Sequence, residues 1–162
     1  MRIVKIYIIA ILVMLSTCGI AMCGMDEDRA KIKTPEDIAK LLSKEYSYEW
    51  RIASKWHTAE ETLESKRGSC KDLATLSQSL LADIGIRSDI IVIRFKGLKI
   101  SHAVCTWMDE GGYSFMTNRG YVKTGAQSLE GALDAYYPDW KEIVFTTPDG
   151  KYGEVIKSDD NR

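Results

Sequence analysis

The chain has 162 residues, of which 22 are Lys or Arg and 23 are Asp or Glu, so its formal charge is −1 at neutral pH. This length suits one domain with a proper core, and the composition is ordinary for a globular protein. Basic and acidic residues are nearly equal in number, and nothing in the sequence resembles the basic face of a nucleic-acid-binding protein. We therefore expect no nucleic-acid partner.

The N-terminus has the pattern of an export signal. Arg2 and Lys5 precede an uncharged run from Ile6 to Met25, and the first acidic residue is Asp26. A basic start, a short apolar stretch and small residues after it are typical of a secretory signal. We therefore predict a signal over residues 1–24 and an extracytoplasmic domain. A retained membrane anchor is the alternative, since an uncharged run of about 20 residues could just span a bilayer.

The segment Leu15-Ser16-Thr17-Cys18 resembles a bacterial lipoprotein signal, which would lipidate Cys18. Thr17 departs from the Gly or Ala that usually precedes that cysteine. Secretion, periplasmic location and a lipid anchor all stay open at this point, and in each case only the N-terminus would contact a membrane.

The first half of the chain is predicted to be helical. Residues 25–33 form a charged lead-in, and Thr34-Pro35 begins a helix with a good N-cap and Pro in its first turn. Residues 46–52 alternate aromatic and polar side chains, which suggests an extended or irregular segment. Thr58 begins a short helix that we expect to end at Gly68.

A cysteine is predicted in the first turn of the next helix. Gly68 ends the helix before it, and Ser69 with Asp72 forms a near capping box. Cys70 therefore meets unpaired backbone N–H groups and the positive end of the helix dipole, which favour a thiolate. Those N–H groups could also hold an oxyanion, so Cys70 is a candidate nucleophile.

The second half is predicted to be mostly strands. We expect strands over residues 86–95, 100–108, 113–117, 121–122 and 141–146, a short helix over 128–136 and a polar tail over 154–162. Helices followed by an antiparallel sheet give an α+β class, with the domain over residues 34–153.

Two cysteines lie outside the signal region, Cys70 and Cys105. In an oxidising compartment two cysteines often form a disulfide. His102 competes with that interpretation, because strand alternation puts His102 and Cys105 on opposite faces. If the His102 side chain faces Cys70, the Cys105 side chain faces away from Cys70 and cannot form a disulfide with it. The sequence has no Cys-x-x-Cys and no histidine pair, so we expect no zinc site.

Four blocks in order resemble the transglutaminase-like superfamily, and most of all its bacterial cysteine-proteinase branch. They are Trp56–Leu63, Gly68–Ala74, Leu80–Ile86 and His102–Val104, within about residues 46–122. The resemblance implies a papain-like α+β fold, with the cysteine helix packed on an antiparallel sheet, and a Cys–His–Asp triad. It implies Cys70 as the nucleophile and His102 as the general base.

The sequence departs from that family where the triad aspartate is expected. Thr117 holds the position and Asn118 follows it. If Met108 pairs with Tyr113, Thr117 lies on the His102 face, and a shift of one residue would bring Asn118 there instead. Asparagine can orient an imidazole, and threonine can accept one hydrogen bond without supplying charge. We favour Asn118 and keep Thr117 as the alternative.

Two further comparisons with the family concern metal and substrate. Ser69 and Lys71 replace acids that help to bind calcium in part of the family, so we expect no metal and no cofactor. Trp56 matches a family tryptophan and either lines the cleft as a substrate-binding residue or packs in the core.

We therefore predict an exported cysteine hydrolase that acts on peptide or amide bonds of a protein or peptide substrate. An amine acceptor in place of water would make it an acyl transferase. The alternative is a catalytically silent domain that binds a peptide or an envelope partner.

Overall fold

The computed structural model describes residues 29–50 and 55–158. The predicted export signal and the lipidation of Cys18 lie outside the described residues. The chain forms two units, Met1–Lys33 and Thr34–Arg162, and all that follows concerns the second. Within the described ranges, no helix is long and apolar enough to cross a membrane.

The first two helices of this unit begin where predicted, and each begins with a capping box. Helix α2 (Pro35–Glu45) follows Thr34, whose hydroxyl accepts a hydrogen bond from the Asp37 N–H at 3.2 Å. Helix α3 (Ala59–Ser65) follows Thr58, whose hydroxyl accepts from the Glu61 N–H at 3.1 Å. In both boxes the acidic side chain accepts the N–H of the cap residue in return.

Helix α3 ends earlier than predicted, at Ser65 rather than Gly68. Lys66 adopts a left-handed conformation with φ of 53°, which stops the helix. Strand β2 (Arg67–Gly68) follows and pairs in parallel with strand β1 (Ser47–Tyr48). The segment over 46–52, predicted to be extended or irregular, is thus a strand only at residues 47–48, and residues 51–52 lie outside the described residues.

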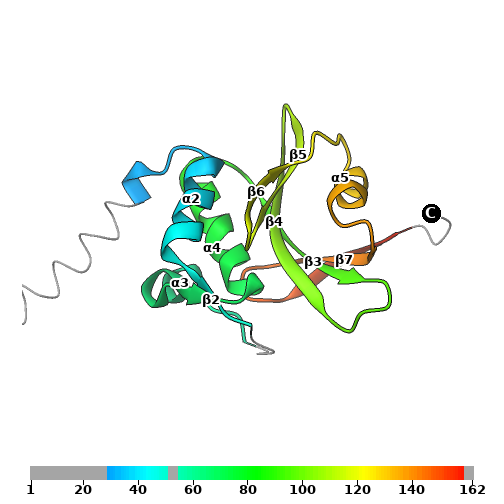
Figure 1. Ribbon diagram of the computed structural model, residues 1–162, viewed down its shortest axis with the longest axis horizontal. Coiled ribbons are helices and arrows are strands. Elements are labelled where there is room, and N and C mark those ends of the chain that lie inside the picture. Colours follow the sequence, from blue (N-terminus) through cyan, green and yellow to red (C-terminus); the bar gives the residue numbers. More distant parts are fainter. Residues whose placement is uncertain (1–28, 51–54, 159–162) are drawn as a thin grey trace, which may run out of the picture. The chain divides into compact units, whose positions relative to one another are not determined.

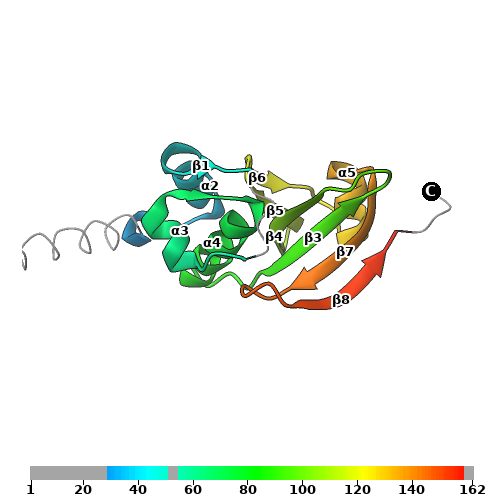
Figure 2. The ribbon, with the colours of Figure 1, turned by 90° about the horizontal axis from the view of Figure 1, so that it is seen from below.

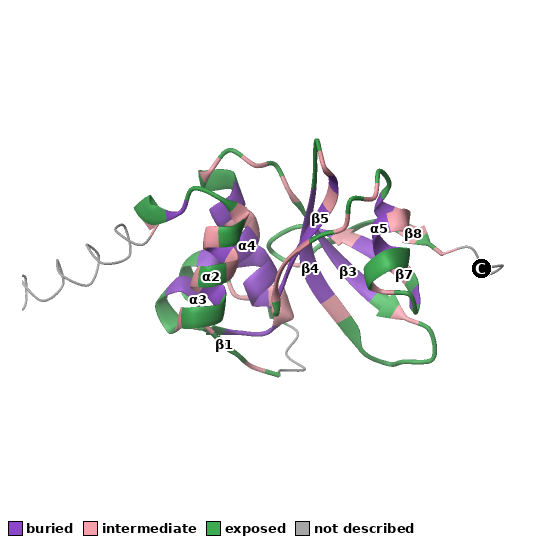
Figure 3. Ribbon diagram, turned by 45° about the horizontal axis from the view of Figure 1, so that its top comes forward, coloured by how far each residue is buried: buried purple, intermediate pink, exposed green. Residues whose placement is uncertain are grey.

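Helix α4 (Cys70–Asp83) begins with Ser69 as its N-cap residue and Cys70 as its first residue, as predicted. Its apolar side buries Leu73, Leu76, Leu80 and Leu81. The turn after it contains Gly85, whose φ of 80° is a conformation that residues with a side chain rarely adopt. Figure 3 shows that buried residues follow α4 and the central strands.

Six strands form one antiparallel sheet in the order β6-β5-β4-β3-β7-β8 (Figure 2). Five of them, all except β8, agree with the predicted strands to within a few residues. Their bounds are β3 (Asp89–Phe95), β4 (Ser101–Asp109), β5 (Gly112–Thr117), β6 (Gly120–Lys123), β7 (Trp140–Thr146) and β8 (Tyr152–Lys157). Strand β8 corrects the prediction that the polar tail starts at residue 154, because backbone pairing with β7 carries the sheet through to Lys157.

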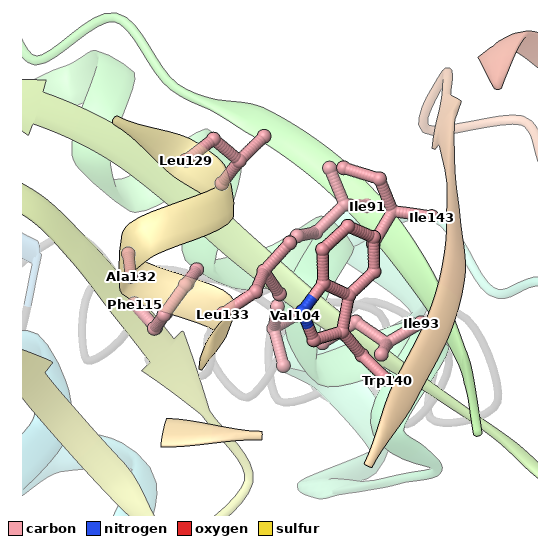
Figure 4. Close-up of a cluster of buried hydrophobic side chains, with 9 residues drawn as sticks. All are labelled: Ile91, Ile93, Val104, Phe115, Leu129, Ala132, Leu133, Trp140 and Ile143. Atoms are coloured by element: carbon pink, nitrogen blue, oxygen red, sulfur yellow. The ribbon is translucent and has the colours of Figure 1, made fainter. Parts of the chain in front are cut away.

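Helices cover both faces of this sheet (Figure 1). Helix α4 packs on the face that presents Ala103, and helix α5 (Leu129–Tyr136) packs on the opposite face. Figure 4 shows the second core, in which Leu133 of α5 and Trp140 pack over the strands. A cysteine helix packed against an antiparallel sheet is the α+β, transglutaminase-like arrangement predicted from the sequence.

Gly150 offers a test of the packing at the turn between β7 and β8. Its φ is 79°, and a Cβ added there would lie 2.8 Å from the Trp56 ring. We expect Gly150→Ala to lower the free energy of unfolding by about 2–4 kcal/mol, from backbone strain together with overpacking. Gly85→Ala is the matched control, since Gly85 has a similar φ of 80° but nothing within 4 Å. Urea unfolding of both variants measures the difference, and equal losses would contradict the packing contribution.

Candidate functional site

A buried carboxylate fixes the start of α4 and with it Cys70. The Asp72 side chain is 1% exposed. It accepts hydrogen bonds from the Ser69 N–H at 2.7 Å, the Ser69 hydroxyl at 2.8 Å and the His57 N–H at 2.8 Å. These bonds tie the first turn of the cysteine helix to the segment before α3, so the half-buried Cys70 side chain has a defined position.

The side chain of Tyr48 lies near Cys70. The parallel pairing of β1 with β2 places Tyr48 opposite Gly68, and the N–H of Glu49 donates to the Gly68 carbonyl at 2.8 Å. The side chains of Tyr48 and Cys70 are close enough to interact, and the pKa of Tyr48 is raised by burial first and by Cys70 second. Tyr48 therefore stays a neutral hydrogen-bond donor at neutral pH.

His102 lies near the start of β4, opposite Ile93 of β3. The Tyr137 ring meets the imidazole edge-on, with 6.1 Å between ring centroids. Burial and, second, the positive charge of Arg119 lower the pKa of His102 to about 4. At neutral pH the imidazole is therefore uncharged, which is the protonation state that a general base needs.

Cys70 and His102 belong to different faces of the sheet. Cys70 packs against the cluster that contains Ala103, whereas His102, next along β4, points to the opposite face. Both lie near Tyr137, since the His102 ring contacts it and Cys70 acts on it electrostatically. No hydrogen bond joins the Cys70 thiol to the His102 ring among the residues the structure describes.

A cleft of about 550 Å³ opens beside this group. It contains three of the predicted site residues, His102, Thr117 and Asn118, together with Tyr48 and Tyr137. The residues lining it are Tyr48, Trp50, Phe95, Ile100, Ser101, His102, Thr117, Asn118, Arg119, Tyr136 and Tyr137.

The predicted pairing of Met108 with Tyr113 is present, so Thr117 lies on the His102 face of the sheet. Its hydroxyl donates to the Gly120 carbonyl at 3.1 Å and accepts from the Arg119 N–H at 3.0 Å. Asn118 is half-buried and lines the cleft. Across the described ranges neither side chain hydrogen-bonds to the His102 ring, so the identity of the orienting residue stays a prediction.

Cys70 and Cys105 are free thiols, so the structure does not contain the disulfide that the sequence left open. Cys105 is fully buried between Ile90 and Met116 of the neighbouring strands. Burial raises the pKa of its thiol to about 12. Cys105 is thus an inert core residue, and Cys70 is the thiol available for chemistry.

Trp56 packs in the core and does not line the cleft. Its side chain is 8% exposed, belongs to the cluster with Ala103 and lies under the Gly150 turn. The ammonium of Lys71 lies 5.7 Å from the centroid of its ring. This placement corresponds to the core alternative in the sequence analysis, and a substrate-binding role for Trp56 remains untested.

Sequence reasoning missed three residues of the site, Tyr48, Arg119 and Tyr137. The aromatic alternation over 46–52 was the signal for Tyr48, but it did not show which aromatic residue faces the cysteine. Tyr137 directly follows the helix predicted over 128–136. Nothing local distinguishes Arg119 from the other basic residues of the chain, because only the β5–β6 turn brings it beside His102.

The comparisons with known proteins agree with this architecture. Residues 25–122 match the family model of the transglutaminase-like domain. The fold is similar to that of calcium-bound LapG from Legionella pneumophila, at 14% identity and a TM-score of 0.51, over 81% of this chain and 89% of that one. A candidate cysteine protease from Cytophaga hutchinsonii also matches, at 16% identity and a TM-score of 0.47, over 85% of this chain and 50% of that one.

No curated protein matches the sequence. The calcium is a property of LapG, and the described part of the present chain has no group of three His, Cys, Asp or Glu side chains that could hold a metal ion. The match to the family model covers more than half of the chain, and the observed fold is similar to that of LapG. The chain therefore belongs to the transglutaminase-like domain family.

Proposed function

We propose that this protein is an exported thiol hydrolase that cleaves peptide or amide bonds, with Cys70 as nucleophile and His102 as general base. The observation that carries the proposal is the placement of Cys70 in the first turn of α4, close to Tyr48 of the cleft that His102 also lines.

In this mechanism the neutral imidazole of His102 takes the proton of the Cys70 thiol as sulfur attacks the substrate carbonyl. The oxyanion that forms accepts hydrogen bonds from the Cys70 backbone N–H and the Tyr48 hydroxyl. His102 then returns the proton to the leaving amine, and water hydrolyses the thioester. Catalytic hydrogen bonds often tighten only when substrate binds, so the mechanism requires His102 and Cys70 to close on each other in the complex.

Removal of the Tyr48 hydroxyl should slow the reaction without weakening the fold. We expect Tyr48→Phe to lower kcat by about 10- to 100-fold, because one oxyanion donor is lost while the ring keeps its packing. KM should change little. Tyr152→Phe, an exposed tyrosine on β8, is the control. An unchanged kcat in Tyr48→Phe would remove Tyr48 from the mechanism.

The fall of kcat/KM at low pH, which we call the acid limb, should occur at an unusually low pH. A general base must be uncharged, and the pKa of His102 is lowered to about 4, so kcat/KM should hold down to about pH 4–5 rather than falling near pH 6.5. Arg119→Gln removes the second cause of that lowering and should move the limb to higher pH. Among the described residues, the charged or titratable side chains shown to act on the His102 ring are Arg119, through its charge, and Tyr137, through ring contact. A limb near pH 6.5 in the unchanged protein would contradict the neutral-base assignment.

The experiment that tests the function is digestion of unfolded casein by the full chain, followed by mass spectrometry of the peptides. We expect new peptide ends that disappear in His102→Ala. His57→Ala is the matched control, because its backbone N–H still donates to Asp72 after the substitution. If the two variants digest casein equally, His102 is not the base.

A catalytically silent binding domain is the second candidate. One observation favours it: within the described residues, no side chain hydrogen-bonds to the His102 ring to fix its orientation. In that case Cys70→Ala would leave the biological effect of the protein intact. Acyl transfer to an amine would use the same thioester, and added amines would then appear in the products.

A further inference from the structure

Among the described residues that line it, the cleft carries a positive charge and no negative one. Its lining residues include Arg119 and no Asp or Glu. The Arg119 side chain is exposed and forms no ion pair or hydrogen bond with any described residue. Arg94 shows the contrast, since its guanidinium pairs with Glu142 at 2.5 Å on the same sheet. A guanidinium in an aromatic cleft without an acid is suited to a carboxylate from outside the protein.

The rim of the same cleft is apolar. Four large side chains that line it are well exposed, namely Tyr48 (41%), Trp50 (65%), Ile100 (48%) and Tyr136 (39%). They come from three separate segments, after α2, before β4 and at the end of α5. Exposed apolar side chains gathered around a concave surface are typical of a binding site for an apolar group.

We propose that the cleft binds an extended peptide in which an apolar or aromatic residue stands next to an acidic one, with the acidic side chain on Arg119. The inference deepens the proposed function by naming the class of peptide that this site accepts. Because apolar side chains from three segments line the same cleft as Arg119, we assign the carboxylate to an internal Asp or Glu rather than to a chain end.

Arg119 also links recognition to His102. The guanidinium is close enough to act on the imidazole, and its positive charge opposes protonation of the ring. A bound carboxylate would offset that charge, so a peptide with an acidic residue should make His102 a stronger base than a neutral peptide does. Peptides with Glu should therefore shift the acid limb of kcat to higher pH than peptides with Gln.

The test measures binding to the full chain carrying Cys70→Ala, so that cleavage plays no part. The probes are two fluorescein-labelled hexapeptides with amidated C-termini that differ only by Glu or Gln beside a central Phe. We expect the Glu peptide to bind about 3- to 10-fold more tightly at low salt, a typical effect for one exposed charge-assisted contact. The preference should shrink at about 0.5 M NaCl because salt screens the pair.

Matched variants assign the two parts of the site. Arg119→Gln should abolish the preference for Glu, whereas Arg87→Gln, an exposed arginine outside the cleft, should keep it. Trp50→Ala should weaken both peptides, and Tyr152→Ala, exposed on β8, should weaken neither. Equal binding of Glu and Gln peptides, or a preference that survives in Arg119→Gln, would overturn the inference.

A third probe separates an internal acid from a chain end. If the Gln peptide with a free C-terminus binds more tightly than the amidated Glu peptide, Arg119 recognises a terminal carboxylate and the assignment to a side chain is wrong. The two proposals can fail independently. If the protein prefers Glu peptides but cleaves nothing, the binding site is supported and the hydrolase function is contradicted. If it cleaves casein but does not prefer acidic peptides, the hydrolase function is supported and the binding site is contradicted.

Discussion

Cys70→Ala is expected to abolish hydrolysis, lowering kcat/KM by about 10³-fold or more, because removal of the nucleophile of a covalent mechanism leaves only binding and oxyanion stabilisation. The fold should survive, since Cys70 is half-buried at the first turn of α4 and alanine is a good helix former. The measurement is the rate of casein cleavage at equal protein concentration.

Cys105→Ala is the control for this result. Cys105 is fully buried and its pKa is raised to about 12, so the substitution should cost some stability and leave kcat unchanged. A Cys70→Ala protein that cleaves casein at the unchanged rate would show that the activity belongs to a different group.

Asp72→Ala is expected to lower the free energy of unfolding by about 3–5 kcal/mol, because it leaves several buried donors without an acceptor. The lost bonds come from the Ser69 N–H, the Ser69 hydroxyl and the His57 N–H. The same carboxylate places Cys70, so variant protein that remains folded should also have a lower kcat. Urea unfolding followed by circular dichroism measures the first effect.

Asp139→Ala is the comparison for Asp72. Asp139 is exposed, and its backbone carbonyl, which accepts from the Lys96 N–H, stays in place after the substitution. The expected change in stability is within about 0.5 kcal/mol. If Asp72→Ala is equally mild, the Asp72 bonds do not hold the helix start.

The helices and strands could be predicted because their signals are local. Capping residues such as Thr34 and Thr58 begin helices by satisfying backbone donors next to them in sequence. The hairpin of β4 and β5 was equally accessible, since Gly111-Gly112 allows the tight turn that pairs Met108 with Tyr113. Strand β8 was missed because its side chains are largely exposed and its stability comes from backbone pairing with β7.

The candidate site was predicted only where its residues carry a local signal. Ser69 and Asp72 around Cys70 indicated a helix start, and that position is confirmed. Tyr48 depends on a two-residue parallel pairing with β2, a contact across the chain that no short pattern encodes. Thr117 illustrates the same limit, because its face was predicted correctly while its hydroxyl bonds within its own turn.

Trapping the covalent intermediate tests the central claim most directly. The full chain is mixed with casein peptides, quenched in acid within seconds and examined by tandem mass spectrometry. The mechanism predicts a peptide joined through a thioester to Cys70, none on the buried Cys105, and a marked loss of the adduct in His102→Ala. Cleavage that proceeds without an adduct on Cys70, or an adduct on another residue, would contradict the assignment of Cys70 as the nucleophile.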